Sequence, residues 1–155
     1  MPLNLKGISV AIVGLCFTGA LLAADKKIGK SELPSAVRKT AEQQSMGSTV
    51  IGYSKEKEDG KLEYEVHMTV KGHSKDVTIA PDGQLLEVEE QLTMSELPAE
   101  VRTALQSKAG KGKITKIESL MKRGTIVAYE AQVLTAGRHA EVQVGPDGKT
   151  LNHEE

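Results

Sequence analysis

The stretch Leu-Glu-Tyr-Glu-Val-His-Met-Thr-Val, residues 62–70, indicates the fold most directly. Its even-numbered positions carry apolar side chains, whereas its odd-numbered positions are polar. Successive side chains of a β-strand point to opposite faces, so a period of two over nine residues predicts a half-buried strand. The face turned away from the core carries Glu63, Glu65, His67 and Thr69.

Turn residues on both sides of this stretch predict an antiparallel meander. An apolar segment at residues 50–53 precedes it and is followed by a break at residues 58–60, Glu-Asp-Gly. Lys71-Gly72 then turns the chain, and Pro81-Asp82-Gly83 suits a hairpin whose glycine takes the left-handed conformation. Sequential strands joined by such short turns are antiparallel.

One helix is expected before each set of strands, over residues 34–45 and 98–109. Pro34 and Pro98 suit the first helical position, where a missing N–H costs nothing. Val37 with Ala41 gives the first helix a narrow apolar stripe, and the second helix has a similar one. Each helix is therefore expected to cover one face of a sheet.

The two halves of the chain match each other in sequence. Ser-Glu-Leu-Pro-Ser-Ala-Val-Arg at 31–38 corresponds to Ser-Glu-Leu-Pro-Ala-Glu-Val-Arg at 95–102, and Pro-Asp-Gly at 81–83 recurs at 146–148. The matches keep their order, which indicates duplication of one supersecondary unit. The sequence therefore predicts an α+β fold of two tandem repeats, residues 31–92 and 93–155. Each repeat is expected to be one helix packed on an antiparallel β-meander of about four strands.

The first 24 residues have the pattern of a secretory signal peptide. Lys6 precedes an apolar run at residues 8–23, and the small residues Ala23 and Ala24 come before a charged segment. A retained membrane anchor is the alternative, but about 16 apolar residues fall short of the roughly 20 that span a bilayer. We expect cleavage near Ala24, a linker at residues 25–30, and a periplasmic or secreted product. Cleavage would also remove Cys16, the one cysteine.

Composition and motifs exclude several classes of function. The chain has 20 basic and 21 acidic residues, so it offers no basic footprint for nucleic acid or for an anionic membrane. Gly-x-Ser-x-Gly and His-Glu-x-x-His motifs are absent, and the glycines around Lys111 follow a helix instead of opening one. The sequence therefore predicts neither an enzyme nor a bound cofactor.

Two histidines form the candidate for a metal site. His67 and His73 lie on either side of a turn, and a metal would need both of them with a carboxylate. Gln132 and Arg138 occupy the matching positions of the second half, which favours solvated surface histidines. We expect no metal, and keep a small-ligand or metal-handling periplasmic protein as the alternative function.

Other titratable groups near the strand ends are expected to be solvated. Adjacent strand residues point to opposite faces, so the two acids of a pair cannot act together. This applies to Glu89-Glu90 and to Glu154-Glu155, and His153 beside the second pair is read as part of a frayed terminus.

The motifs together resemble the PepSY-like family, in tandem. The resemblance rests on Leu-Pro-x-x-Val at a helix start, Tyr-Glu in a strand, a glycine turn, and Pro-Asp-Gly before a leucine and paired acids, from Ser31 to Glu155. It implies the fold of the β-lactamase inhibitor protein, whose concave polar surface grips a partner. PepSY domains also occur in propeptides of secreted thermolysin-type peptidases, which implies a peptidase-binding or inhibiting role. The chain beyond residue 24 lacks Cys, Trp and Phe, so inhibition of β-lactamase itself is not implied.

The polar face of the strands is the candidate binding site. If the sheets run side by side, as the resemblance implies, this face becomes one broad acidic surface for an extended or basic envelope protein or peptidase. We expect no nucleic acid partner and no membrane contact after cleavage, and the oligomeric state is left open. The candidate residues are Glu63, Glu65, His67, Thr69, Glu87, Glu130, Gln132, Glu141 and Gln143.

Overall fold

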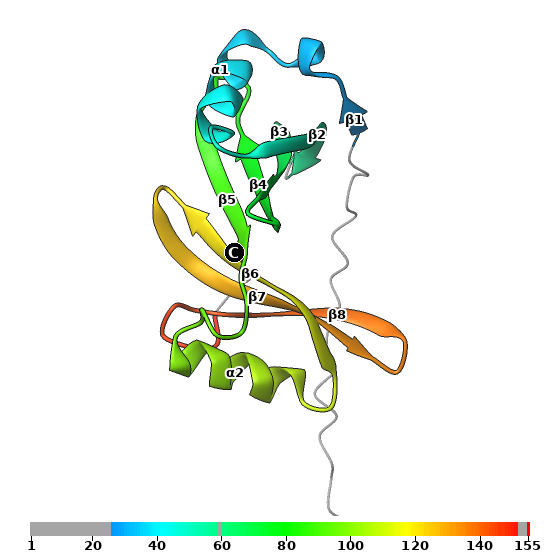
Figure 1. Ribbon diagram of the computed structural model, residues 1–155, viewed down its shortest axis with the longest axis vertical. Coiled ribbons are helices and arrows are strands. Elements are labelled where there is room, and N and C mark those ends of the chain that lie inside the picture. The colour runs from blue at the N-terminus through cyan, green and yellow to red at the C-terminus, as the bar shows by residue number, and fades with distance from the viewer. Residues whose placement is uncertain (1–25, 59, 152–154) are drawn as a thin grey trace, which may run out of the picture.

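The computed structural model of the chain describes residues 26–58, 60–151 and 155 (Figure 1). The predicted signal peptide, together with His153 and Glu154, lies outside the described residues. In chain order the elements are β1 (Lys26–Ile28), a short 3-10 helix η1 (Lys30–Glu32), α1 (Ser35–Gln44), β2 (Thr49–Glu58), β3 (Lys61–Val70), β4 (His73–Ile79), β5 (Leu85–Gln91), α2 (Ala99–Ala109), β6 (Lys113–Lys122), β7 (Thr125–Thr135) and β8 (Arg138–Val144).

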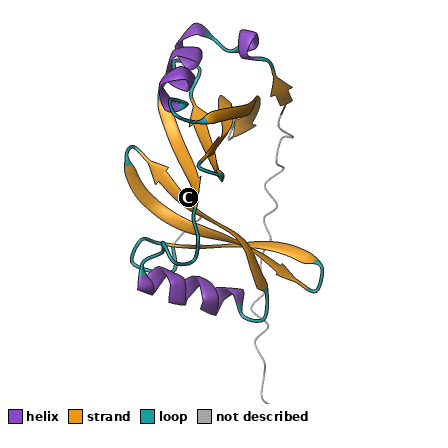
Figure 2. Cartoon of the chain, viewed as in Figure 1, coloured by secondary structure: helices purple, strands orange, loops and turns teal. Residues whose placement is uncertain are grey.

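The eight strands of the described residues form one continuous antiparallel sheet, in which each strand lies beside its neighbours in sequence (Figures 1 and 2). β5 pairs directly with β6, although α2 separates the two strands in sequence, and Val88 lies opposite Met121. The predicted pair of helix-on-meander repeats was therefore wrong: the chain is one mostly-β sheet with two α-helices in its described part. Separate sheets would leave the backbone groups of β5 and β6 unpaired at their edges, and joining the strands satisfies those groups.

The two halves also contribute unequal numbers of strands. α2 is followed by β6, β7 and β8, and residues 149–151, where a last strand was expected, are not in a strand. At the opposite edge of the sheet, the segment predicted as a linker contains β1, whose Lys27 pairs with Ser54 of β2. The first half thus supplies five strands and the second half three, among the residues described.

The helix positions predicted from sequence are confirmed to within one residue at each end. Pro34 and Pro98 are the N-cap residues, one position before the helices begin, with ψ of 151° and 147°. An N-cap residue has an extended backbone, and the ring of proline holds φ at a value compatible with it. Among the described residues, neither helix is long and apolar enough to cross a membrane.

Both helices pack on the same face of the sheet, where two hydrophobic clusters form. The α1 cluster consists of Leu33, Val37, Ala41, Tyr64, Val66, Met68, Val77, Ile79 and Val88. The α2 cluster consists of Leu97, Val101, Leu105, Ile117, Tyr129, Ala131 and Val144. Met121, which pairs with Val88, packs against the first cluster from β6, so the apolar face continues across the junction. Strand alternation leaves the other face of the sheet to polar side chains.

The two Pro-Asp-Gly turns contact the helices. Gly83 and Gly148 have φ of 90° and 75°, which confirms the left-handed conformation predicted for both. An added Cβ would lie 2.9 Å from the carbonyl oxygen of Ala36 at Gly83, and 2.7 Å from that of Glu100 at Gly148. Each turn therefore lies against the first turn of a helix, and glycine is needed there both for its conformation and for its small size.

Candidate functional site

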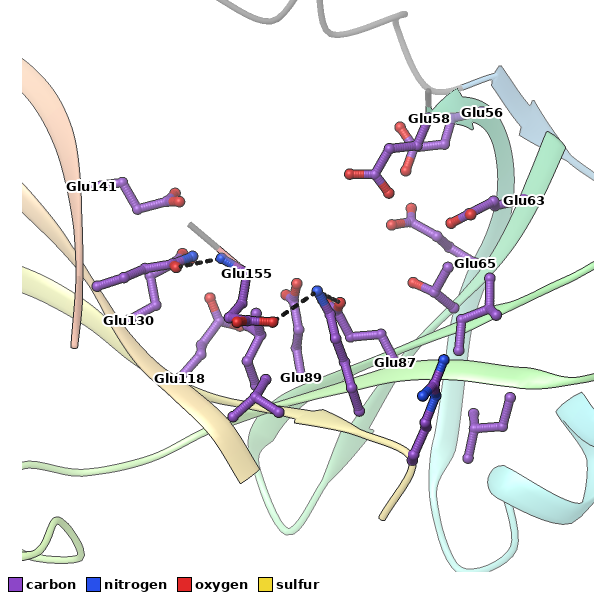
Figure 3. A pocket seen from close by; sticks show the side chains of 18 of the residues that line it. Glu56, Glu58, Glu63, Glu65, Glu87, Glu89, Glu118, Glu130, Glu141 and Glu155 are labelled. Carbon is purple, nitrogen blue, oxygen red and sulfur yellow. Dashed lines mark hydrogen bonds and ion pairs between the residues drawn. The ribbon is translucent and has the colours of Figure 1, made fainter. Parts of the chain in front are cut away.

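The sheet face opposite the helices is hollowed into a groove with a volume of about 1150 Å³. Its lining comes from β2 to β8, so it crosses nearly the whole sheet. We call it the acidic groove, because ten glutamates converge on it from both sides (Figure 3): Glu56, Glu58, Glu63, Glu65, Glu87, Glu89, Glu118, Glu130, Glu141 and Glu155.

Strand register brings these carboxylates together. Glu65 in β3 lies opposite Thr78 in β4, which lies opposite Glu87 in β5. Farther along the sheet, Glu118 in β6 lies opposite Glu130 in β7. Acids so close together on one sheet face repel one another when they are charged, which opposes folding.

Basic residues offset only part of the negative charge. The described lining includes three of them, Lys116, Lys122 and Arg123. The ammonium of Lys116 lies 2.6 Å from Glu118 Oε1, and that of Lys122 lies 3.4 Å from Glu87 Oε2 and 3.8 Å from Glu155 Oε2. With ten glutamates against three cations, the groove keeps an excess of negative charge that suits a positively charged ligand.

The most crowded carboxylates lie on the three central strands. One carboxylate oxygen each of Asp76, Glu89 and Glu118 lies within 4.8 Å of the other two. Glu118 is only 4% exposed, and Lys116 supplies the positive charge beside it. Burial lowers the pKa of Lys116, but the hydrogen bond with Glu118 and the charges of Glu118 and Asp76 outweigh it and raise that pKa. In this structure the chain's own lysine therefore provides the cation for the cluster.

Glu89 is the most strongly perturbed acid of the groove. Burial, then a hydrogen bond with Glu87, then the charge of Glu118 raise the pKa of its carboxyl to about 9. Removing a carboxylate from water and surrounding it with like charges both favour the protonated form. Glu89 therefore carries a proton at neutral pH. The expectation that it is a solvated strand end was wrong, because that expectation took no account of the neighbouring β6.

A second protonated site lies toward β8. Burial raises the pKa of Glu130 to about 8, and a hydrogen bond with Glu141 adds to the shift, while a hydrogen bond donated by Gln143 Nε2 at 2.9 Å opposes it. Burial, followed by the charges of Glu58 and Glu87, also raises the pKa of Glu63. Some carboxyl groups of the acidic groove are therefore protonated, and so uncharged, near pH 7.

A chain of hydrogen bonds beside the groove joins Ser54, His67 and Asp76. His67 Nδ1 lies 2.9 Å from Asp76 Oδ1, and His67 Nε2 lies 2.9 Å from Ser54 Oγ. This order of groups resembles a serine-hydrolase triad, but Ser54 is 1% exposed and donates its hydroxyl proton to Glu65 Oε2. A nucleophile must reach its substrate and be activated by the imidazole. Ser54 meets neither condition, so the chain of bonds positions Glu65 and Asp76.

Seven of the nine candidate residues from the sequence line the acidic groove. They are Glu63, Glu65, Glu87, Glu130, Gln132, Glu141 and Gln143. The other two, His67 and Thr69, do not line it: His67 bonds to Asp76, and Thr69 pairs with Ser74. His67 and His73 are not cross-strand partners, since the register places His73 opposite Val70. The two histidines that a metal site would need are thus not paired across the β3–β4 hairpin.

Sequence reasoning missed several groove residues. In β6, the apolar Leu120 lies on the groove side with Lys116, Glu118 and Lys122, while the polar Ser119 lies on the other face, so no clear period of two marks this strand. In β2, the residues from Ser54 to Glu58 are all polar, so nothing in the sequence indicates which of them face the groove. The missed lining residues with ionisable side chains are Glu56, Glu58, Glu89, Lys116, Glu118, Lys122, Arg123 and Glu155.

Several solved structures from Bacteroides share this architecture. A protein from Bacteroides eggerthii that is described as periplasmic superposes with a TM-score of 0.63 at 17% identity, covering 77% of this chain and 86% of its own. A DUF2874 family protein from Bacteroides ovatus gives 0.61 at 17% identity, covering 77% and 84%. A BLIP-like protein from Bacteroides fragilis gives 0.58 at 18% identity, covering 78% and 85%.

The comparisons establish the fold of the chain. No protein-family model matches the sequence, and no curated protein matches it. The structural likenesses have identities below 20%, a level at which they concern architecture alone. The β-lactamase-inhibitor-protein-like part of the resemblance is thereby supported: this chain has a BLIP-like fold, which it shares with periplasmic and DUF2874 family proteins.

Proposed function

We propose that the chain is an exported binding module of the cell envelope that binds a protein partner through basic side chains received in the acidic groove. The observation that carries the proposal is the convergence of ten glutamates on one sheet face while both helices cover the other. These glutamates belong to neither hydrophobic cluster, and like charges on one sheet face repel one another, so packing of the core does not explain their convergence.

The shape of the groove favours a protein over a small ligand. Small-molecule sites are mostly apolar and enclosed, with volumes of about 300–1,000 Å³. The acidic groove is larger, polar, and spread over seven strands. An extended segment or loop of a protein, carrying several lysines or arginines, matches this width and charge better than a compact ligand does.

Two further observations support an envelope location and a class of partner. The sequence begins with the pattern of a signal peptide, and structures of the same architecture include periplasmic proteins. The motifs Leu-Pro-x-x-Val and Pro-Asp-Gly resemble those of PepSY-like proteins, some of which accompany secreted peptidases. A peptidase with a basic surface is therefore the first partner to try.

The composition of the groove sets the expected strength of binding. Tight interfaces concentrate their energy in Trp, Tyr and Arg. The groove lining has one arginine and no aromatic residue among the described residues. Binding through exposed ion pairs is weakened by salt, so affinity should be modest and should fall as ionic strength rises above about 0.15 M.

Charge reversal on the groove tests the proposed function. Glu58 and Glu141 line the groove from opposite sides and are exposed, so lysine at both positions should leave stability within about 0.5 kcal/mol. The double variant should bind deca-lysine and a basic secreted peptidase at least tenfold more weakly. Glu42→Lys with Glu90→Lys changes net charge equally at two exposed acids outside the groove lining. Equal loss of binding in both double variants would mean that net charge alone determines binding, and it would contradict the proposal that the acidic groove is the binding site.

A further inference from the structure

We infer that a basic partner entering the acidic groove displaces protons from Glu89 and Glu130, so that its affinity rises with pH through the neutral range. This inference rests on the proposed function and adds its regulation. It requires acids that are crowded enough to hold protons in the free protein and that lie where the partner's cations arrive.

Glu89 meets both requirements because it lines the groove among groups from four strands. Asp76 of β4 is its direct cross-strand partner, and Glu87 lies two residues away on β5. β6 contributes Glu118 and Lys116, whose charges face the same point, and β7 contributes Glu130. Four acids thus surround Glu89, and the two lysines beside them are already paired, Lys116 with Glu118 at 2.6 Å and Lys122 with Glu87 at 3.4 Å.

Glu130 has a similar but less crowded setting. It lies directly opposite Glu118 of β6 and close to Glu141 of β8, while Gln143 donates to its Oε2 at 2.9 Å. The backbone N–H of Glu155 in turn donates to Gln143 Oε1 at 3.1 Å, which holds the amide in this orientation. Both acids line the same groove, so one bound segment can reach the two of them.

The sign of the pH dependence follows from linkage. In the free protein the pKa values of about 9 and about 8 keep both groups protonated at pH 7. A lysine or arginine of the partner stabilises the carboxylate form, which lowers both values in the complex and sends the protons to the buffer. Affinity is then reduced as pH falls and increases with rising pH up to the free-state values. Each proton released at a given pH changes affinity by about tenfold per pH unit.

Calorimetry with deca-lysine measures the proton release directly. At pH 7 and low salt, the binding heat in two buffers of different ionisation enthalpy gives the number of protons released, and we expect one to two. Glu89→Gln keeps the size of the side chain but has no proton to lose, so release should fall by about one. Glu90→Gln makes the same change at the adjacent residue, which is exposed, lies outside the groove lining and pairs with Lys75 at 2.9 Å, and it should leave the release unchanged.

The outcomes separate this inference from the proposed function. Binding of deca-lysine without proton release, or equal release from Glu89→Gln and the wild type, overturns the inference and leaves groove binding intact. Absence of binding at every pH overturns both. A carboxyl carbon NMR titration of the free protein tests the inference without any ligand. Glu89 should titrate above pH 7, and titration near the ordinary glutamate pKa of about 4.5 would overturn the inference.

Discussion

At the scale of single residues, Glu89 shows how one side chain ties fold stability to the chemistry of the groove. When the pKa of a carboxyl is higher in the folded state than in the unfolded state, the folded state is most stable relative to the unfolded state at low pH, where the group is protonated in both. That contribution is lost as pH rises from the unfolded value of about 4.5 to the folded value of about 9. The groove is therefore maintained at a cost in stability that grows with pH.

Replacing Glu89 by glutamine should remove this cost. We expect Glu89→Gln to unfold like the wild type at pH 5 and to be more stable by about 1–2 kcal/mol at pH 8, a figure reduced for partial solvent access. Urea denaturation at the two pH values measures the difference. Glu90→Gln serves as the control, since Glu90 is exposed and paired with Lys75, and its effect should not grow with pH. A Glu89→Gln effect that is equal at both pH values would contradict the raised pKa.

At the scale of elements, the hairpins and helices act as joined units. Gly83 approaches the backbone of Ala36 in α1, and Thr40 of the same helix donates to the carbonyl oxygen of Gly83 at 2.7 Å. The turn that links β4 to β5 therefore also fixes the helix on the sheet.

Two alanine substitutions separate the conformational role of glycine from this contact. Gly83 and Gly124 both have positive φ, but an added Cβ meets Ala36 at Gly83 and nothing within 4 Å at Gly124. Gly124→Ala should cost about 1 kcal/mol from the left-handed conformation alone. Gly83→Ala should cost clearly more, on the order of 2–3 kcal/mol, as judged from urea midpoints at constant m-value. Equal costs would mean that the hairpin does not press on the helix.

Prediction from sequence was also most successful for the secondary-structure elements. Proline before each helix, glycine in each turn and the period of two in β3 are local signals, and they located the helices, the turns and seven of the residues that line the groove. The pairing of β5 with β6 depends on contacts between residues about 30 apart, such as Val88 and Met121, for which no local signal exists. Glu118 was missed for the same reason, because its role arises only when β6 lies beside β5.

At the scale of the whole molecule, the continuous sheet predicts cooperative unfolding. Val37 and Leu105 are fully buried in the α1 and α2 clusters respectively. Leu105→Ala should cost about 2–5 kcal/mol and Val37→Ala somewhat less, and each should shift one common transition. Calorimetry would show a single peak for both variants. Two separated peaks, one of them unaffected by each substitution, would show that the clusters unfold independently despite the shared sheet.

The neighbour-to-neighbour order of the sheet also bears on how quickly the chain folds. Most strands pair with the next strand across a turn of a few residues, and only β1 with β2 and β5 with β6 are separated by a helix. Closing short loops costs little chain entropy, and folding rates rise as contacting residues come closer in sequence. A sheet that in other topologies would assemble slowly can here form progressively from its hairpins, with the β5–β6 pairing as the one long closure between its halves.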